Sequence, residues 1–127
     1  MWDIPIEREI QKNIAIQAFG DVLVAGYGLG IVQEYLIKNP KVKSLLTIEK
    51  LKEVVVLAEK NYGRIYGNIE IGDFFTYSPK RQFDCVIGDI WEEITSECLK
   101  DYKEFESKAK NLLKPNGRIF AWGSRFF

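Results

Sequence analysis

The sequence has 127 residues, of which 46% are hydrophobic and 28% are charged, and its 18 Lys and Arg balance its 18 Asp and Glu. This length fits one domain, residues 1–127, and the balanced charge provides no basic field for holding nucleic acid. The sequence has no histidine, and its two cysteines, Cys85 and Cys98, lack the spacing of metal ligands. The commonest general base and most transition-metal sites are therefore absent, and we expect no metal.

Charged residues near the start interrupt any signal-peptide pattern, and the apolar runs are far shorter than a membrane span. No CxxC spacing or disulfide framework is present, so reduced thiols are the default. We therefore expect a cytoplasmic protein with no membrane contact and no nucleic-acid partner.

Hydrophobic periodicity predicts helices and strands that alternate along the chain. A helical period predicts an N-terminal helix from Ile6 to Phe19, within a helical segment that occupies residues 1–19. Short apolar runs predict buried strands, and periodic segments that stop near Gly or Pro predict helices. The further predicted elements are strand Val22–Ala25, helix Ile31–Lys38, strand Val42–Ile48, helix Leu51–Tyr62, strand Arg64–Ile71, strand Phe83–Ile87, a mostly helical segment Glu92–Leu113 in one or two pieces, and strand Arg118–Trp122.

This order predicts an α/β fold with a mostly parallel five-stranded sheet and helices on both faces, a three-layer sandwich. Strands such as "VLVA" and "CVIG" are apolar throughout, as expected of strands covered on both sides. Ligands of such sheets bind beyond the carboxyl ends of the strands. The residues that follow each strand are therefore the candidates for a site.

Three glycines, Gly26, Gly28 and Gly30, follow the first strand. Without a Cβ, they let the backbone turn sharply and approach a ligand. The third glycine comes one residue too early for the dinucleotide pattern GxGxxG, where Ile31 stands instead, and a P-loop is absent. Close packing of a helix on the sheet is an equally good explanation of the glycines alone.

Glu49 follows the second strand, about 20 residues beyond the first glycine, which is typical of an acid that binds a ribose. Its two oxygens match two vicinal hydroxyls. The alternative is an acid that stabilises the next helix through its dipole.

The third and fourth strands are also followed by acids. Asp73, between Gly72 and Phe74, has the chemistry to accept the exocyclic amine of adenine while an aromatic ring covers the base; an ordinary turn is the alternative. Asp89 has the chemistry to position an amine or act as a base, with Trp91 as a wall. Alternatively, Asp89 caps the following helix and Trp91 lies in the core.

Taken in order, these stretches resemble the motifs of the class I S-adenosylmethionine-dependent methyltransferases, and most closely those of the spermidine synthase-like branch. The matching stretches are "VLVAGYGLG", "SLLTIEK", "IEIGDFF", "FDCVIGDIW" and "LLKPNGRIFAW". The resemblance implies strand order 3-2-1-4-5, S-adenosylmethionine as cofactor, and a chain that lacks the last two strands of that fold. It implies a catalytic role for Asp89, a substrate wall at Trp91, and cofactor contacts at Ala25, Gly26, Tyr27, Gly28, Gly30, Glu49, Lys50, Gly72, Asp73, Phe74 and Asp89.

One departure from these motifs is Val24, which stands where many members carry an acid. We expect a small methyltransferase that acts on an amine or another small polar acceptor, or on a protein. The alternatives are a non-catalytic cofactor-binding or assembly module and an aminopropyltransferase like the spermidine synthases. A nicotinamide dehydrogenase is disfavoured by the glycine spacing.

The end of the sequence predicts self-association. If the fifth strand lies at the sheet edge, it presents unpaired backbone groups together with aromatic side chains. We therefore expect a homodimer, or another partner, that covers this edge around Phe120, Trp122, Phe126 and Phe127.

Overall fold

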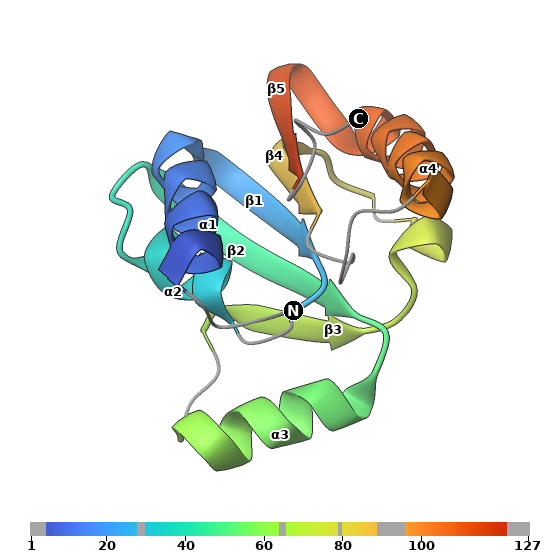
Figure 1. Cartoon of the computed structure of the whole chain (residues 1–127). Coiled ribbons are helices and arrows are strands. Elements are labelled where there is room, and N and C mark those ends of the chain that lie inside the picture. Colours follow the sequence, from blue (N-terminus) through green and yellow to red (C-terminus); the bar gives the residue numbers. More distant parts are fainter. Residues whose placement is uncertain (1–4, 28–29, 64–65, 79, 89–95, 122–127) are drawn as a thin grey trace.

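The computed structural model describes residues 5–27, 30–63, 66–78, 80–88 and 96–121, which form one parallel sheet flanked by helices (Figure 1). The strands are β1 (Gly20–Ala25), β2 (Val42–Glu49), β3 (Asn68–Ile71), β4 (Phe83–Gly88) and β5 (Leu113–Ala121). Their spatial order is β3-β2-β1-β4-β5, and every pairing is parallel. The predicted α/β class and strand order are confirmed.

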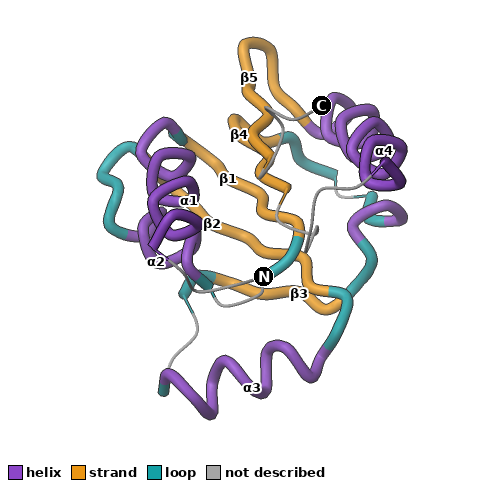
Figure 2. The backbone as a smooth tube through the Cα atoms, in the orientation of Figure 1, coloured by secondary structure: helices purple, strands orange, loops and turns teal. Residues whose placement is uncertain are grey.

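Two helices cover one face of the sheet and one covers the other. On the first face, α1 (Pro5–Gln17) and α2 (Ile31–Ile37) pack together. On the opposite face lie α4 (Ser96–Leu112) and the single 3-10 turn η1 (Phe74–Thr76). Helix α3 (Lys52–Tyr62) runs beside the β3 edge, as Figure 2 shows. No helix within the described ranges is long and apolar enough to span a membrane.

The central strand β1 separates two apolar cores. Val22 and Val24 face α1 and α2, whereas Leu23 and Ala25 face α4, and all four side chains are fully buried. Full burial of a side chain such as Leu or Val stabilises the fold by about 1.5–3 kcal/mol. Because β1 is covered on both faces, packing fixes the position of its carboxyl end. The segment Gly26–Gly30, which we call the glycine stretch, begins there.

Some predicted boundaries were wrong. Strand β3 begins at Asn68 and not at Arg64, because Gly67 has φ +81° and interrupts the extended backbone. Strand β5 begins at Leu113, directly after α4, and not at Arg118. The segment "LKPNG" bulges between two paired stretches of this strand, with Asn116 at φ 70°, and this irregularity hid the first stretch from the prediction. The predicted start of the long helix at Glu92 and the strand end at Trp122 lie outside the described residues.

An ion network joins the amino ends of the strands, opposite the glycine stretch. Lys114 Nζ donates to Asp21 at 2.9 Å and to Asp84 at 3.2 Å, and Ser44 Oγ donates to the other oxygen of Asp21 at 2.7 Å. Arg81 lies 3.6 Å from Asp21. The hydrogen bonds from Ser44 and then Lys114 lower the pKa of Asp21 below its ordinary value.

We expect the substitution Asp21→Asn to reduce the free energy of unfolding by about 1 kcal/mol near pH 7, because it removes a charge that the network stabilises. Since the folded protein lowers the pKa of Asp21, this contribution is complete above the ordinary aspartate pKa and is lost as pH falls through the lowered value. Urea unfolding at about pH 7 and about pH 2 measures the change.

Glu9→Gln, on the exposed surface of α1, is the control for removal of an acid. A difference between wild type and Asp21→Asn that is the same at both pH values would contradict the role of the charge.

Candidate functional site

The carboxyl ends of β1, β2 and β3 lie side by side at one end of the sheet, the carboxyl end. The amide of Gly26, after β1, donates to the carbonyl of Ile48 at 2.9 Å, and the amide of Gly72, after β3, donates to the carbonyl of Glu49 at 2.9 Å. The strand-end residues identified from sequence are therefore joined through the backbone of β2.

The side chain of Glu49 lies at the middle of this end of the sheet, because β2 lies between β1 and β3. It is only 7% exposed, and its two oxygens accept different backbone amides, from Tyr27 at 2.8 Å and from Leu51 at 3.0 Å. A carboxylate oxygen has two lone pairs, so each retains an acceptor position for a further donor. The carboxylate is thus fixed in orientation with two acceptor positions left.

The buried side-chain amide of Gln33 supports the start of the glycine stretch through a hydrogen bond. Gln33 of α2 is fully buried, and its Nε2 donates to the carbonyl of Gly26 at 3.1 Å and to the hydroxyl of Thr47 at 3.2 Å. Its Oε1 is buried and has no hydrogen-bond partner among the described residues. Gln11 of α1 supports the same helix by accepting the amide of Val32 at 3.1 Å.

The side chain of Tyr27 fills the space beneath the glycine stretch. It is 1% exposed, and its hydroxyl accepts the amide of Tyr66 at 3.0 Å. Burial raises the pKa of the Tyr27 phenol above its ordinary value. A methyl group at Gly30 would lie 2.7 Å from the Tyr27 hydroxyl oxygen, and Gly30 has φ +75°. Gly30 is therefore glycine for close packing and backbone conformation, one of the two explanations left open by the sequence.

The turn after β3 carries Asp73 in a capping position. Its Oδ1 accepts the amide of Phe75 at 2.9 Å and so begins η1, while its Oδ2 lies 4.0 Å from Nζ of the exposed Lys50. The cap uses one carboxylate oxygen. The other oxygen, Oδ2, faces Lys50. A role of Asp73 in the turn is therefore compatible with a role in binding a ligand.

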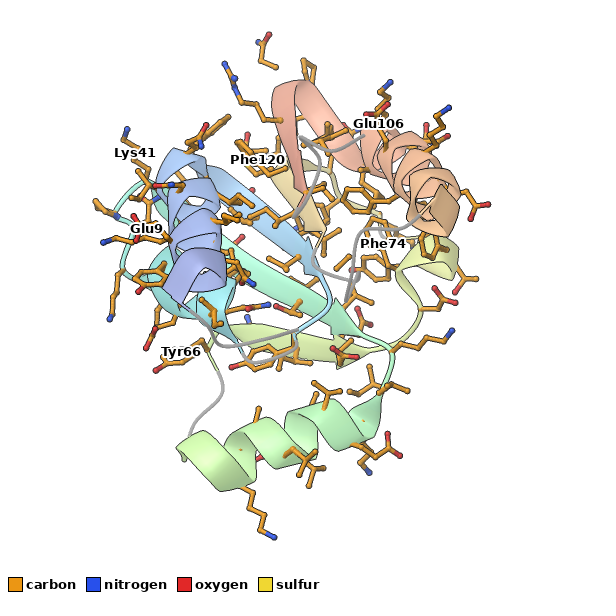
Figure 3. All side chains as sticks on the ribbon, viewed as in Figure 1. Glu9, Lys41, Tyr66, Phe74, Glu106 and Phe120 are labelled. Carbon is orange, nitrogen blue, oxygen red and sulfur yellow. The ribbon has the colours of Figure 1, made fainter. Side chains whose placement is uncertain are left out.

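The apolar side chains near this strand end divide into buried and exposed ones. Phe74 is buried, and its ring lies 5.3 Å from that of Phe105 of α4, so it faces the core (Figure 3). The exposed apolar side chains here are Leu51 at 54%, Ile71 at 48% and Phe75 at 39%. Ile71 pairs with Glu49 across the sheet. Sequence reasoning selected Phe74 and missed these three.

The remaining predicted residues divide into two groups. Ala25 is fully buried and packs in the core beneath the stretch. Gly28, Asp89 and Trp91 lie outside the described residues, so their predicted contacts stay predictions. Within the described ranges, no three His, Cys, Asp or Glu side chains gather as a metal site would require.

Comparison of the sequence with protein-family models gives no match, and a search of curated proteins gives no significant match. The structure, in contrast, matches many solved structures. An S-adenosylmethionine-dependent methyltransferase from Clostridium acetobutylicum superposes with a TM-score of 0.64 at 21% identity, over 93% of this chain and 50% of that one. The N-methyltransferase NodS from Bradyrhizobium japonicum superposes with a TM-score of 0.68 at 19% identity, over 93% of this chain and 68% of that one.

A third similar structure is described as a complex of DhpI with SAH; it has a TM-score of 0.65 at 21% identity, over 91% of this chain and 54% of that one. The chain thus spans about half the length of the first of these methyltransferases and of DhpI. The likeness establishes a Rossmann-like fold of the kind these methyltransferases have.

We expect Gly30→Ala to reduce the free energy of unfolding by about 2–4 kcal/mol, because it combines a left-handed backbone with a contact to the Tyr27 ring. Gly63→Ala is a matched control, since Gly63 has φ +73° but open space where the methyl group would lie. Denaturant unfolding of both variants separates the two costs. Equal losses in the two variants would show that the contact with Tyr27 contributes nothing.

Proposed function

We propose that this chain binds S-adenosylmethionine at the carboxyl ends of β1, β2 and β3, and that it serves a methyl transfer. The observation that carries the proposal is the buried Glu49 carboxylate, held by two backbone amides beside the glycine stretch. The similarity of the fold to an S-adenosylmethionine-dependent methyltransferase, and to a structure described as a complex with SAH, supports it.

The residues present fit the nucleoside part of this cofactor. The remaining acceptor positions of Glu49 suit the two hydroxyls of a ribose, whose donors are vicinal. Asp73 keeps one oxygen that its cap does not use, which suits the amine of adenine. Leu51 and Ile71 offer exposed apolar surface close to these acids in sequence and register, and a flat base gains by covering such surface.

The bound cofactor supplies an electrophilic methyl group, and the protein supplies position and orientation. Asp89 follows β4, the neighbour of β1, so we propose it as the residue closest to the acceptor. An amine or a small polar molecule is the proposed acceptor, because a carboxylate suits such a group; the description of NodS as an N-methyltransferase supports the amine by analogy of fold.

Two other functions remain candidates. The spermidine synthase-like branch rests on sequence motifs alone, and preferential binding of the decarboxylated cofactor would favour it. A non-catalytic module would bind the cofactor yet transfer no label to amines, polyamines or proteins in a radiolabelled methyl screen. For all of these functions we propose a cytoplasmic location.

We expect S-adenosylhomocysteine to bind the wild-type protein with measurable heat in titration calorimetry. Glu49→Gln should weaken this binding at least tenfold, about 1.4 kcal/mol or more, because the amide has one acceptor oxygen in place of two. Glu53→Gln, an exposed acid in the first turn of α3, is the matched control and should bind like wild type. No heat and no thermal shift at millimolar ligand would refute the cofactor assignment.

We also propose that the chain forms a homodimer through the open edge of β5. Within the described residues, β5 pairs only with β4, so its outer backbone groups have no neighbouring strand. Phe120 is partly buried against the core of its own chain, as Figure 3 places it near β5, and it is not a free aromatic. The backbone edge therefore supports the proposal more than this side chain does.

Light scattering should report a dimer at high protein concentration. Replacing the exposed Arg118 with Pro should shift the mass toward the monomer, because proline removes a backbone donor from β5; urea unfolding of the same variant checks that its pairing with β4 within the chain survives. Lys103→Ala, on the exposed surface of α4, is the control. A clean monomer for wild type at the highest soluble concentration would exclude the dimer.

A further inference from the structure

The role of Tyr27 is unusual for a residue within a run of glycines. Its side chain is 1% exposed, so it does not face a ligand in the site. It also occupies the space that a larger residue at position 30 would need. Any influence of this side chain on ligand binding must therefore act through the groups that it contacts.

Tyr27 connects two segments that are far apart in sequence. Its amide donates to Glu49 at 2.8 Å, and its hydroxyl accepts the amide of Tyr66 at 3.0 Å. The hydroxyl of Tyr66 in turn donates to Glu34 of α2 at 3.4 Å. Figure 3 shows Tyr66 beside the amino end of β3, so the phenol of Tyr27 holds the point where the chain enters that strand.

Strand β3 has little apolar packing to hold it. It has four residues at the edge of the sheet, only Ile69 of them is partly buried, and Ile71 is 48% exposed. Its position therefore depends on hydrogen bonds. Besides its ladder with β2, these include the bond from Tyr66 to Tyr27 before the strand, the bond from Gly72 to Glu49 after it, and a side-chain hydrogen bond between Glu70 and Tyr77.

Asp73 lies two residues after the end of this strand, so its position depends on the position of the strand. We propose that the Tyr27 hydroxyl is a positioning group for base recognition: by holding the Tyr66 amide it fixes β3, and through β3 the Asp73 carboxylate, relative to the glycine stretch. This inference rests on the proposed function, in which Asp73 accepts the amine of adenine. It predicts that loss of one hydroxyl, remote from the ligand, lowers discrimination between bases.

The first experiment compares two ligands by calorimetry, S-adenosylhomocysteine and its counterpart with hypoxanthine in place of adenine. Wild type should prefer the adenine ligand, and Asp73→Asn should reduce that preference. Tyr27→Phe should reduce it by about threefold to tenfold, the range expected for one hydrogen bond. Tyr35→Phe, which removes a hydroxyl from a partly buried tyrosine on α2, is the matched control and should keep the wild-type preference.

The second experiment needs no ligand. Amide hydrogen exchange followed by mass spectrometry should show about tenfold faster exchange in peptides that cover residues 66–73 of Tyr27→Phe. Peptides from β1 and β4 should exchange as in wild type. A variant that is merely less stable would show faster exchange throughout the sheet and an equal loss of affinity for both ligands.

The outcomes separate the inference from the function on which it rests. Faster exchange at residues 66–73 together with reduced discrimination supports the inference. Unchanged exchange there overturns it, and so does unchanged discrimination in Tyr27→Phe when Asp73→Asn has lost the preference. If wild type binds neither ligand, the proposed function fails and base positioning fails with it, while the exchange data still report whether the hydroxyl fixes β3.

Discussion

The position of one carboxylate organises the carboxyl edge of this sheet. The Glu49 side chain accepts the amides of Tyr27, two residues after β1, and of Leu51, just before α3, and its own carbonyl accepts the amide after β3. Three strand ends are thereby fixed around one buried charge. Burying a carboxylate costs desolvation free energy, which hydrogen bonds from the protein offset. The same hydrogen bonds fix the direction in which the Glu49 oxygens point.

The two ends of the sheet solve different problems. At the amino end, the two acids Asp21 and Asp84 and the two cations Lys114 and Arg81 form a network that ties β1, β4 and β5 together. At the carboxyl end, no cation among the described residues lies as close to an acid: Lys50 and Asp73 are 4.0 Å apart, and both side chains are exposed to solvent. The first arrangement stabilises the fold, whereas the second leaves carboxylate oxygens that, in the proposed function, accept the hydroxyls and the amine of the cofactor.

Local patterns of buried strands and periodic helices predicted the α/β class and most element boundaries, whereas the strand order came from the resemblance to the methyltransferases. Glu49 and Asp73 were selected as candidates because parallel strands bring their carboxyl ends together, and the structure places both at that end of the sheet. Contacts between residues distant in sequence were not predicted. They are the hydrogen bond from Gln33 to Gly26, the hydrogen bond from the Tyr66 amide to the Tyr27 hydroxyl, and the contact between the rings of Phe74 and Phe105. A polar residue on the buried side of an apolar helix, such as Gln33 in "IVQEYLI", was the available signal for one of them.

The contact between Tyr27 and Gly30 bears on how this loop can change over evolutionary time. The phenol ring lies where any side chain at position 30 would have to go. The two positions are therefore coupled: an exchange at one alters which residues are tolerated at the other, and their effects do not add. A lineage that shrank the tyrosine would gain room at the neighbouring site, so substitutions here should arise in pairs and in a preferred order.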